Sequence, residues 1–267
     1  MTMFTADNMS NAQYHATDAI SSSAVKTVHG KSLAHWKAQR NFTPTPAMAI
    51  GTAVHDMVLE DGNGVARGPA DRRGNAWKDA FADAEAGGKL LLTAGDYDTA
   101  RNVADSVLLH PVGQRMAGDD TVNEASFFAT DPETGLELKT RPDSYWLDRG
   151  IVYDIKTCQS SLPKDVARDV NTYSYALQGA FYLKVLRLAG FEANSFTFVF
   201  VEKTPPYAVN VSVLSDEFLQ YAERQVDATL MKIAEARLVS RFDTGYSDGL
   251  NTIELPRWLQ ADNFDNN

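Results

Sequence analysis

The chain contains very little cysteine and no long apolar run. Cys158 is the single cysteine among 267 residues, so no disulfide can form within one chain, and we expect a reducing, cytoplasmic compartment. One cysteine also excludes an iron–sulfur cluster held by four thiolates. No stretch approaches the roughly 18 apolar residues that span a bilayer. The first ten residues lack the basic and apolar regions of a signal peptide, so we expect neither secretion nor membrane association.

Positive charge and a nucleotide-binding loop are also scarce. There is no GxxxxGK[ST] motif, so ATP is not expected as a cofactor. The 25 lysines and arginines are outnumbered by 35 acidic residues, giving a formal net charge of −10. This argues against a general nucleic-acid coat, because affinity for phosphate comes largely from Lys and Arg. An enzyme acting on DNA remains open, since basic residues can gather locally. Two groups could do so or could be solvated surface: Lys26, Lys31, Lys37 and Arg40, and Arg67, Arg72 and Arg73.

Residues 136–158 predict the centre of the fold. Strands over 136–147 and 151–157 are joined by a polar turn at 148–150, where Gly150 supplies the backbone freedom of a tight reversal. Asp154 and Lys156 lie two apart on the second strand and therefore share a face. Buried strands seldom carry charge unless it is paired or holds a metal ion.

The turn length decides where Asp143, on the first strand, lies. A two-residue turn at 149–150 places Asp143 opposite Lys156. A three-residue turn would put it on the other face, unless a bulge near Pro142 restored it. We expect Asp143, Asp154 and Lys156 on one face.

Such a face has the chemistry of a divalent-metal site. Two carboxylates bind a hard cation such as Mg²⁺ through oxygen, and Mn²⁺ can substitute. A neighbouring lysine can orient or deprotonate a water, while the metal ion stabilises charge on a phosphate. The alternative is a surface hairpin with an ordinary Asp–Lys pair, because Asp-x-Lys triplets are common.

Pro142-Asp143 followed by Asp154-Ile155-Lys156 resembles the signature of the PD-(D/E)xK nuclease superfamily in its Asp variant. The wider likeness is to the RecB/RecE-like branch, and especially to the RecE-type (exodeoxyribonuclease VIII) nuclease domain. Four further segments carry it in the same order along most of the chain. They are residues 47–55, Glu124, residues 175–182 and residues 255–258.

The resemblance implies roles for residues whose spacing alone is uninformative. His55 in an apolar helix would otherwise be a hydrogen-bonded core residue, and Glu124 an exposed strand residue. By resemblance, both join Asp143, Asp154 and the carbonyl of Ile155 as metal ligands. The catalytic residues would be Asp143, Asp154 and Lys156. A Q-x-x-x-Y motif, Gln178 and Tyr182, would bind the substrate, with Tyr175 contributing more weakly.

The predicted fold is α/β, with a restriction-endonuclease-like core in which helices flank a central mixed β-sheet. We expect a flexible segment at 1–17, a single nuclease domain at 18–260 and a disordered tail at 261–267. The predicted strands are 122–130, 137–147, 151–157, 195–202 and 208–214. The predicted helices are 22–39, 47–59, 75–86, 94–109, 164–189 and 216–239.

The function implied by the resemblance is a Mg²⁺-dependent exodeoxyribonuclease. It would degrade one strand of linear double-stranded DNA from its 5′ end. The remaining 3′ tail would serve a single-strand annealing protein in recombination, in a bacterial or phage setting. By analogy with processive exonucleases, a homo-oligomeric ring is expected. Two alternatives stay open: a structure-specific or single-strand endonuclease of the same fold, and a catalytically silent module that binds DNA or recruits a partner.

Overall fold

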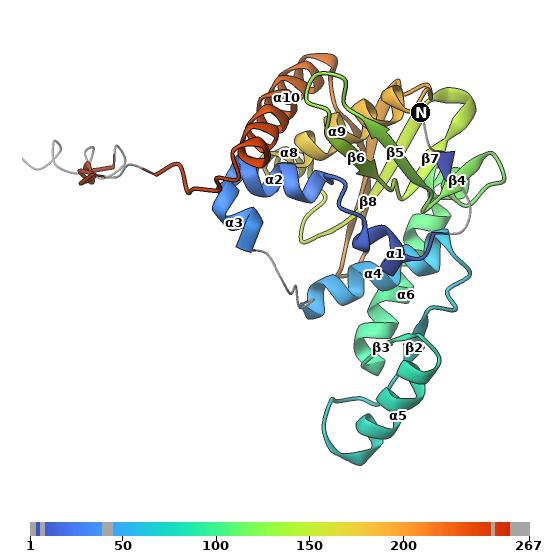
Figure 1. Ribbon diagram of the computed structural model, residues 1–267. Helices are drawn as coiled ribbons and strands as arrows, with labels where there is room; N and C mark the ends of the chain where they lie inside the picture. The colour runs from blue at the N-terminus through green and yellow to red at the C-terminus, as the bar shows by residue number, and fades with distance from the viewer. Residues whose placement is uncertain (1–3, 6–8, 39–44, 247–248, 257–267) are drawn as a thin grey trace, which may run out of the picture.

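The structure, a computed structural model, describes residues 4–5, 9–38, 45–246 and 249–256. A central sheet is covered by helices on both faces, and a smaller projection containing α5 extends from it (Figure 1). The strands are β1 Phe4–Thr5, β2 Val65–Arg67, β3 Leu90–Leu92, β4 Thr121–Asn123, β5 Ser126–Thr130, β6 Glu137–Thr140, β7 Ser144–Trp146, β8 Ile151–Cys158, β9 Ser195–Glu202 and β10 Val209–Val213. The helices are α1 Asn11–Ala16, α2 Ser22–Gly30, α3 Leu33–Ala38, α4 Pro46–Leu59, α5 Gly74–Ala86, α6 Ala94–Leu109, α7 Pro111–Met116, η1 Leu147–Arg149, α8 Pro163–Thr172, α9 Tyr175–Leu188 and α10 Asp216–Leu238.

The central sheet has the strand order β10-β9-β8-β7-β4 and is mixed. β8 and β9 run parallel, whereas β10, β7 and β4 each run antiparallel to their neighbours. The prediction of an α/β fold with a central mixed sheet flanked by helices is therefore confirmed. Among the described residues, no helix combines the length and the apolar character needed to cross a bilayer.

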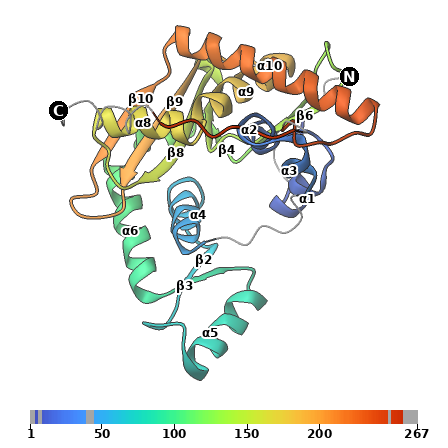
Figure 2. The same ribbon diagram turned by 90° about the vertical axis from the view of Figure 1, so that its left-hand side faces the viewer.

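Two hydrophobic cores lie on the two faces of this sheet. Tyr153 and Ile155 of β8 pack with α4 and α6, whereas Val152 and Cys158 pack with α2, α9 and α10. Figure 2 shows these two groups of helices on opposite sides of the strands. The alternation follows from the two-residue period of a strand, which sends successive side chains to opposite faces. Asp154 and Lys156 therefore point toward the side of α2 and α9.

Two strands that the sequence predicts as continuous are each broken once. Residues 122–130 form β4 and β5, and residues 137–147 form β6 and β7. β4 and β7 belong to the central sheet, whereas β5 and β6 pair in a second sheet with β1. Both breaks arise because the two paired segments bend at the same level. Pro142 has no N–H for a ladder, and Glu124 has a left-handed backbone with φ of 50°.

Two predicted helices are also divided. Residues 22–38 form α2 and α3, because the Ser32 hydroxyl accepts a hydrogen bond from the backbone N–H of His35 and starts a new helix. Residue 39, the predicted end, lies outside the described residues. The predicted helix 164–189 is divided into α8 and α9 at Ser174, whose φ of 53° does not fit a right-handed helix.

The segment expected to be flexible contains both β1 and α1. Ser10 and Gln13 form a capping box at the start of α1, and Tyr14 is buried. At the other end of the chain, Leu255 and Pro256 are exposed. Residues 257–258 and the predicted disordered tail at 261–267 lie outside the described residues.

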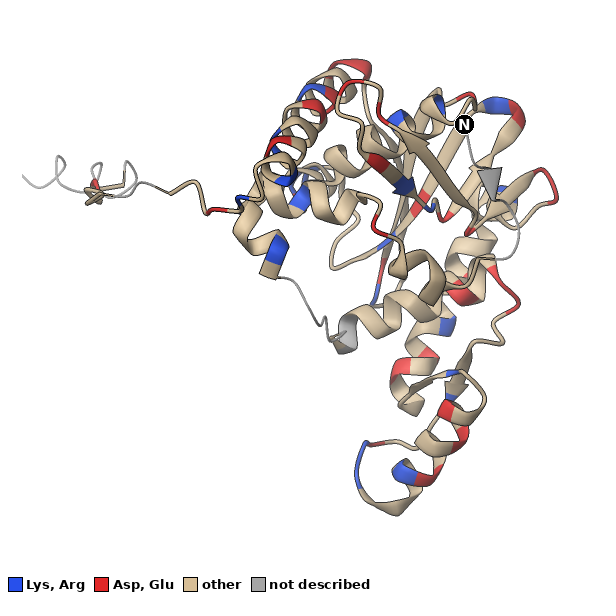
Figure 3. Ribbon diagram, viewed as in Figure 1, with Lys and Arg blue, Asp and Glu red and all other residues tan. Residues whose placement is uncertain are grey.

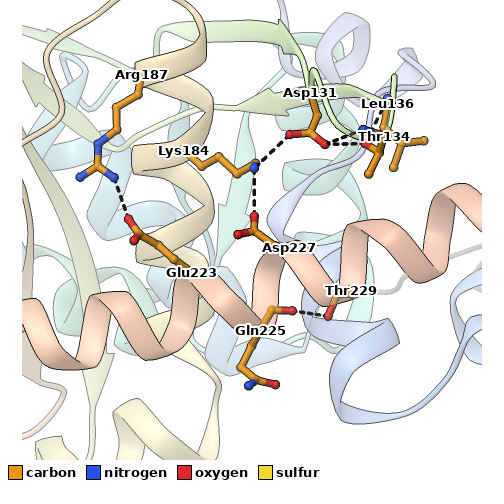
Figure 4. Close-up of polar contacts among 9 residues, drawn as sticks. All are labelled: Asp131, Thr134, Leu136, Lys184, Arg187, Glu223, Gln225, Asp227 and Thr229. Carbon is orange, nitrogen blue, oxygen red and sulfur yellow. Dashed lines mark hydrogen bonds and ion pairs between the residues drawn. The ribbon is translucent and has the colours of Figure 1, made fainter.

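An ion-pair network fixes α10 against α9 and the turn after β5. Lys184 of α9 lies 3.0 Å from Asp131 and 2.9 Å from Asp227 of α10 (Figure 4). The Asp131 carboxylate is buried, and it also accepts hydrogen bonds from the backbone N–H and hydroxyl of Thr134. Removing one member of a buried pair leaves an unpaired charge out of water.

The change Lys184→Met is therefore expected to lower the free energy of unfolding by about 3 kcal/mol. Urea denaturation followed by circular dichroism measures it. The matched control is Glu223→Gln, which weakens a second ion pair between the same two helices. That pair, with Arg187, is much more exposed and is expected to cost less than about 1 kcal/mol. Equal losses in the two variants would contradict this account.

Candidate functional site

The turn before β8 is longer than the sequence predicts. Leu147–Arg149 form a single 3₁₀ turn, and Gly150 follows in the left-handed region with φ of 61°. Ser144 consequently pairs with Tyr153, and Trp146 with Ile151. In this register Asp143 is opposite Asp154 and not opposite Lys156, so neither the two-residue nor the three-residue turn considered from the sequence is found. The register differs by two residues, which keeps side chains on the predicted faces.

Beyond Ser144 the strands β7 and β8 separate, and Ile155 loses its neighbour on that side. In the same register its partner would be Pro142, which has no N–H to donate. Two side chains form hydrogen bonds with the N–H and the carbonyl of Ile155 instead. The Ile155 N–H donates to Asp143 Oδ2 at 2.7 Å, and the Ile155 carbonyl accepts from His55 Nε2 at 3.2 Å. The broken ladder thus fixes the positions of two predicted site residues.

His55 reaches this edge from α4. Thr45 caps that helix by accepting a hydrogen bond from the Met48 N–H, and Pro46 stands in its first turn. Because His55 Nε2 donates to a carbonyl, the neutral ring has its free lone pair on Nδ1. Nδ1 lies 3.5 Å from Asp143 Oδ1. The tautomer that suits a metal ligand at Nδ1 is therefore favoured by the backbone of β8.

Glu124 completes a group of three potential ligands. The β4–β7 and β5–β6 ladders keep one register through the bend, which places Glu124 opposite Asp143. The Glu124 N–H donates to the Asp143 carbonyl at 3.2 Å. His55, Glu124 and Asp143 can each offer an atom such that all three atoms lie within 4.8 Å of one another. Glu124, Asp143 and Asp154 thus form one row across three strands.

The row is electrostatically unfavourable without a cation. Burial raises the pKa of Glu124 to about 8, and the neighbouring Asp143 and Glu60 carboxylates contribute. Burial likewise raises the pKa of Asp143 to about 6, against the lowering effect of His55 and with a further increase from Asp154. Like charges on directly opposed strand residues repel each other. A cation bound among them would stabilise the ionised forms of both Glu124 and Asp143.

Asp154 has different partners from the other two acids. Its Oδ1 accepts a hydrogen bond from Gln178 Nε2 at 2.5 Å, and its Oδ2 forms an ion pair with Lys156. Burial lowers the pKa of Lys156, but the Asp154 and Asp143 carboxylates outweigh this effect and raise it. Asp154 therefore stands beside the three clustered ligands and links them to Lys156 and Gln178.

The two predicted tyrosines lie in different surroundings. The Tyr175 ring contacts Phe198 and has the ammonium of Lys156 5.1 Å from its centroid. Tyr182 packs on Phe196 and lies on the wall of a cavity of about 1050 Å³ bounded by α1, α2 and α4. Burial raises the pKa of Tyr182 far above its ordinary value. Tyr175 is thus next to the charged residues, whereas Tyr182 faces the adjoining cavity.

The two predicted basic groups are not simple cationic patches. In the projection, Arg67 is paired with Asp98 and Arg72 with Asp96. Lys31 and Lys37 are exposed, and Arg40 lies outside the described residues. Basic and acidic positions are interspersed along the helices, and both also occur in the central strands (Figure 3).

The sequence placed Lys26 only in one of these basic groups. In the structure its side chain lies at the candidate site. Its ammonium donates to Gln178 Oε1 at 3.2 Å and lies 5.7 Å from the centroid of the Tyr175 ring. Burial and the nearby Lys156 lower the pKa of Lys26 to about 8. The two partners are 152 residues apart in the chain, so no local spacing could reveal the contact.

The donor set fits a divalent cation. One buried and one half-buried carboxylate, both with raised pKa values, converge with one imidazole nitrogen, and hard divalent ions prefer such oxygen-rich sites. His55, Glu124 and Asp143 would hold the ion, with Asp154 adjacent. The Ile155 carbonyl, a predicted ligand, is engaged by His55.

Fold and site together define a restriction-endonuclease-like α/β protein with an acidic cluster at a break in its central sheet. The chain belongs to the family described as PDDEXK-like domain of unknown function (DUF3799), whose family model matches residues 21–246. Membership of the PD-(D/E)xK superfamily is thereby confirmed. The narrower likeness to the RecE-type domain stays a prediction.

One solved structure shows the same fold, and a second one is reported beside it for its similarity alone. A candidate exonuclease from Eubacterium rectale superposes with a TM-score of 0.65 at 16% identity, covering 97% of this chain and 99% of that chain. A phage-related exonuclease from Haemophilus somnus gives a TM-score of 0.39 at 13% identity, covering 83% and 95%. No curated protein matches the chain.

The acidic row predicts an unusual dependence of stability on pH. A raised carboxyl pKa means that the folded state still holds protons that the unfolded state has released. Stability of the metal-free protein is therefore expected to fall as pH rises from about 4.5 to about 8, the ordinary and folded pKa values of Glu124. Thermal unfolding in EDTA across this range measures it. Glu124→Gln should flatten the curve between pH 6 and 8.

Added Mg²⁺ is expected to raise the melting temperature of the wild-type protein more at pH 8 than at pH 6, because the ion competes with protons for the carboxylates. A wild-type melting temperature that is independent of pH over this window would contradict the described electrostatics.

Proposed function

We propose that this protein is a divalent-metal-dependent exodeoxyribonuclease that degrades one strand of linear double-stranded DNA. The observation that carries the proposal is the meeting of His55, Glu124 and Asp143 beside the Asp154–Lys156 pair. Family membership supports it, because the fold is that of PDDEXK-like proteins. The Eubacterium rectale protein, described as a candidate exonuclease, has the same fold.

Phosphodiester hydrolysis requires a water oxygen to attack phosphorus while the bond to the leaving oxygen breaks. Negative charge then develops on the phosphate and on the leaving oxygen. A cation bound by His55, Glu124 and Asp143 would stabilise that charge and lower the pKa of a water; we propose Mg²⁺, for which Mn²⁺ can substitute.

Lys156 would supply a second positive charge from the chain itself. Its raised pKa keeps the ammonium protonated at neutral pH, which favours orienting a water or a phosphate oxygen over removing a proton. Asp154 holds this ammonium in place, and Gln178 in turn holds Asp154. Tyr175, Gln178 and Tyr182 would contact the DNA strand.

The finer features of the proposal follow from the resemblance described above. Digestion would proceed from the 5′ end and leave a 3′ tail for a single-strand annealing partner. A homo-oligomeric ring would keep the enzyme on its substrate. With a net charge of −10, an isolated chain has little general attraction for DNA, so enclosure of the duplex is a reasonable way to remain bound.

Digestion of end-labelled linear duplex tests this function directly. We expect Mg²⁺-dependent release of nucleotides from the 5′-labelled strand and none in EDTA. A covalently closed plasmid should stay intact, because an exonuclease needs an end. Cutting of the closed plasmid would establish an endonuclease instead. Complete absence of metal-dependent cleavage would favour a silent binding module.

Asp143→Asn is expected to lower kcat at least about 100-fold, because the change removes a charged ligand and weakens the contact that fixes the Ile155 edge. Lys156→Ala should cost at least about tenfold, since a cation beside the phosphate is lost. The control is Asp148→Asn, an exposed turn residue five positions along, which should leave kcat within about twofold. Comparable losses in the control would show that the assay reports only net charge.

A further inference from the structure

Gln178 lies between a group that can only donate hydrogen bonds and one that can only accept them. Its Nε2 donates to Asp154 Oδ1 at 2.5 Å, and its Oε1 accepts from the ammonium of Lys26 at 3.2 Å. Gln178 itself is buried at 6% exposure, so water has little access to either end of the amide. The orientation of the amide is therefore decided by these two neighbours.

The two orientations of a glutamine amide differ only in the exchange of oxygen and nitrogen. An ammonium has three donors and no acceptor, and an ionised carboxylate accepts only. A flipped amide would set its NH₂ against the Lys26 ammonium and its oxygen against the Asp154 carboxylate. Both contacts would be repulsive, and both would leave buried polar groups unpaired. With Lys26 present, one orientation alone satisfies all three groups.

The same contacts connect Lys26 to the rest of the charged cluster. Asp154 accepts from Gln178 through Oδ1 and pairs with Lys156 through Oδ2. The ammonium groups of Lys26 and Lys156 both lie over the Tyr175 ring, at 5.7 and 5.1 Å from its centroid. A chain of contacts thus runs from α2 through α9 to β8.

We propose that Lys26 is a positioning residue, which fixes the amide of Gln178 so that its NH₂ group holds Asp154, and through Asp154 the ammonium of Lys156, in the orientation used for cleavage. The catalytic consequence rests on the proposed nuclease function, whereas the structural role does not. Lys26 acts through Gln178 and needs no contact with the DNA.

A double-mutant cycle separates this role from direct binding of DNA. Lys26→Met keeps the length of the side chain and removes the donor. We expect it to lower kcat about tenfold with KM changed less than about twofold, the loss typical of one hydrogen bond to a charged group. Lys26→Arg should restore most of the activity. The matched control is Lys31→Met, an exposed lysine at the end of the same helix, which should leave kcat unchanged.

In a Gln178→Leu background, Lys26→Met should have no further effect, because the group through which it acts is gone. If Lys26→Met still lowers kcat or raises KM about tenfold in that background, Lys26 acts on the substrate itself and the proposal is overturned.

The side-chain amide of Gln178 provides a readout that needs no activity. Its NH₂ resonances can be identified in a ¹⁵N–¹H spectrum by their absence from the Gln178→Leu variant. We expect them to shift or broaden in Lys26→Met and to stay in place in Lys31→Met. Unchanged resonances in Lys26→Met would overturn the proposal. If the wild-type protein cleaves no DNA, the nuclease function fails, but this measurement still decides whether Lys26 orients Gln178.

Discussion

The separation of β7 from β8 at Pro142 is the constraint on which the site depends. A proline cannot donate to the Ile155 carbonyl, so the ladder ends there and leaves both backbone groups of Ile155 open. Buried backbone groups need partners. Asp143 and His55 supply them, and in doing so both are held at the position where Glu124 arrives from the other strand. The same break that weakens the sheet therefore orders the ligand group.

The cost of this arrangement is electrostatic. Three carboxylates stand in one row, and two of them have pKa values raised mainly by burial. His55 and Lys156 lower the pKa of Asp143, and Arg141 lowers the pKa of Glu124, but burial and the neighbouring carboxylates outweigh these effects. The two apolar cores on the faces of the sheet contain none of these acids, so the packing that stabilises the fold does not depend on them. A site that is unfavourable when empty is one that binds a cation with a gain in stability.

The sequence predicted the helices and strands better than the turns and breaks between them. The largely apolar stretch 151–157 and the helical segments 47–59 and 94–109 gave elements close to those observed, because each depends on the local sequence. Asp154 and Lys156 lie on one face as expected. The register of Asp143 follows neither of the turn lengths considered, since the residues of the turn did not reveal that Leu147–Arg149 form a 3₁₀ turn. The breaks at Glu124 and Ser174 depend on left-handed backbone in residues that seldom adopt it, so composition gave no signal there.

The contact between Lys26 and Gln178 shows a second limit of prediction from sequence, because its partners are 152 residues apart. His55 comes from α4 on one face, whereas Gln178 and Lys26 come from α9 and α2 on the other. Strand β8 contacts both groups, through the Ile155 backbone and the Asp154 side chain. Lys26 of α2 reaches Asp154 through Gln178, whereas His55 is attached to α4 on the other face. The candidate ligand His55 and the amide that holds Asp154 thus come from opposite faces of the sheet and meet at β8.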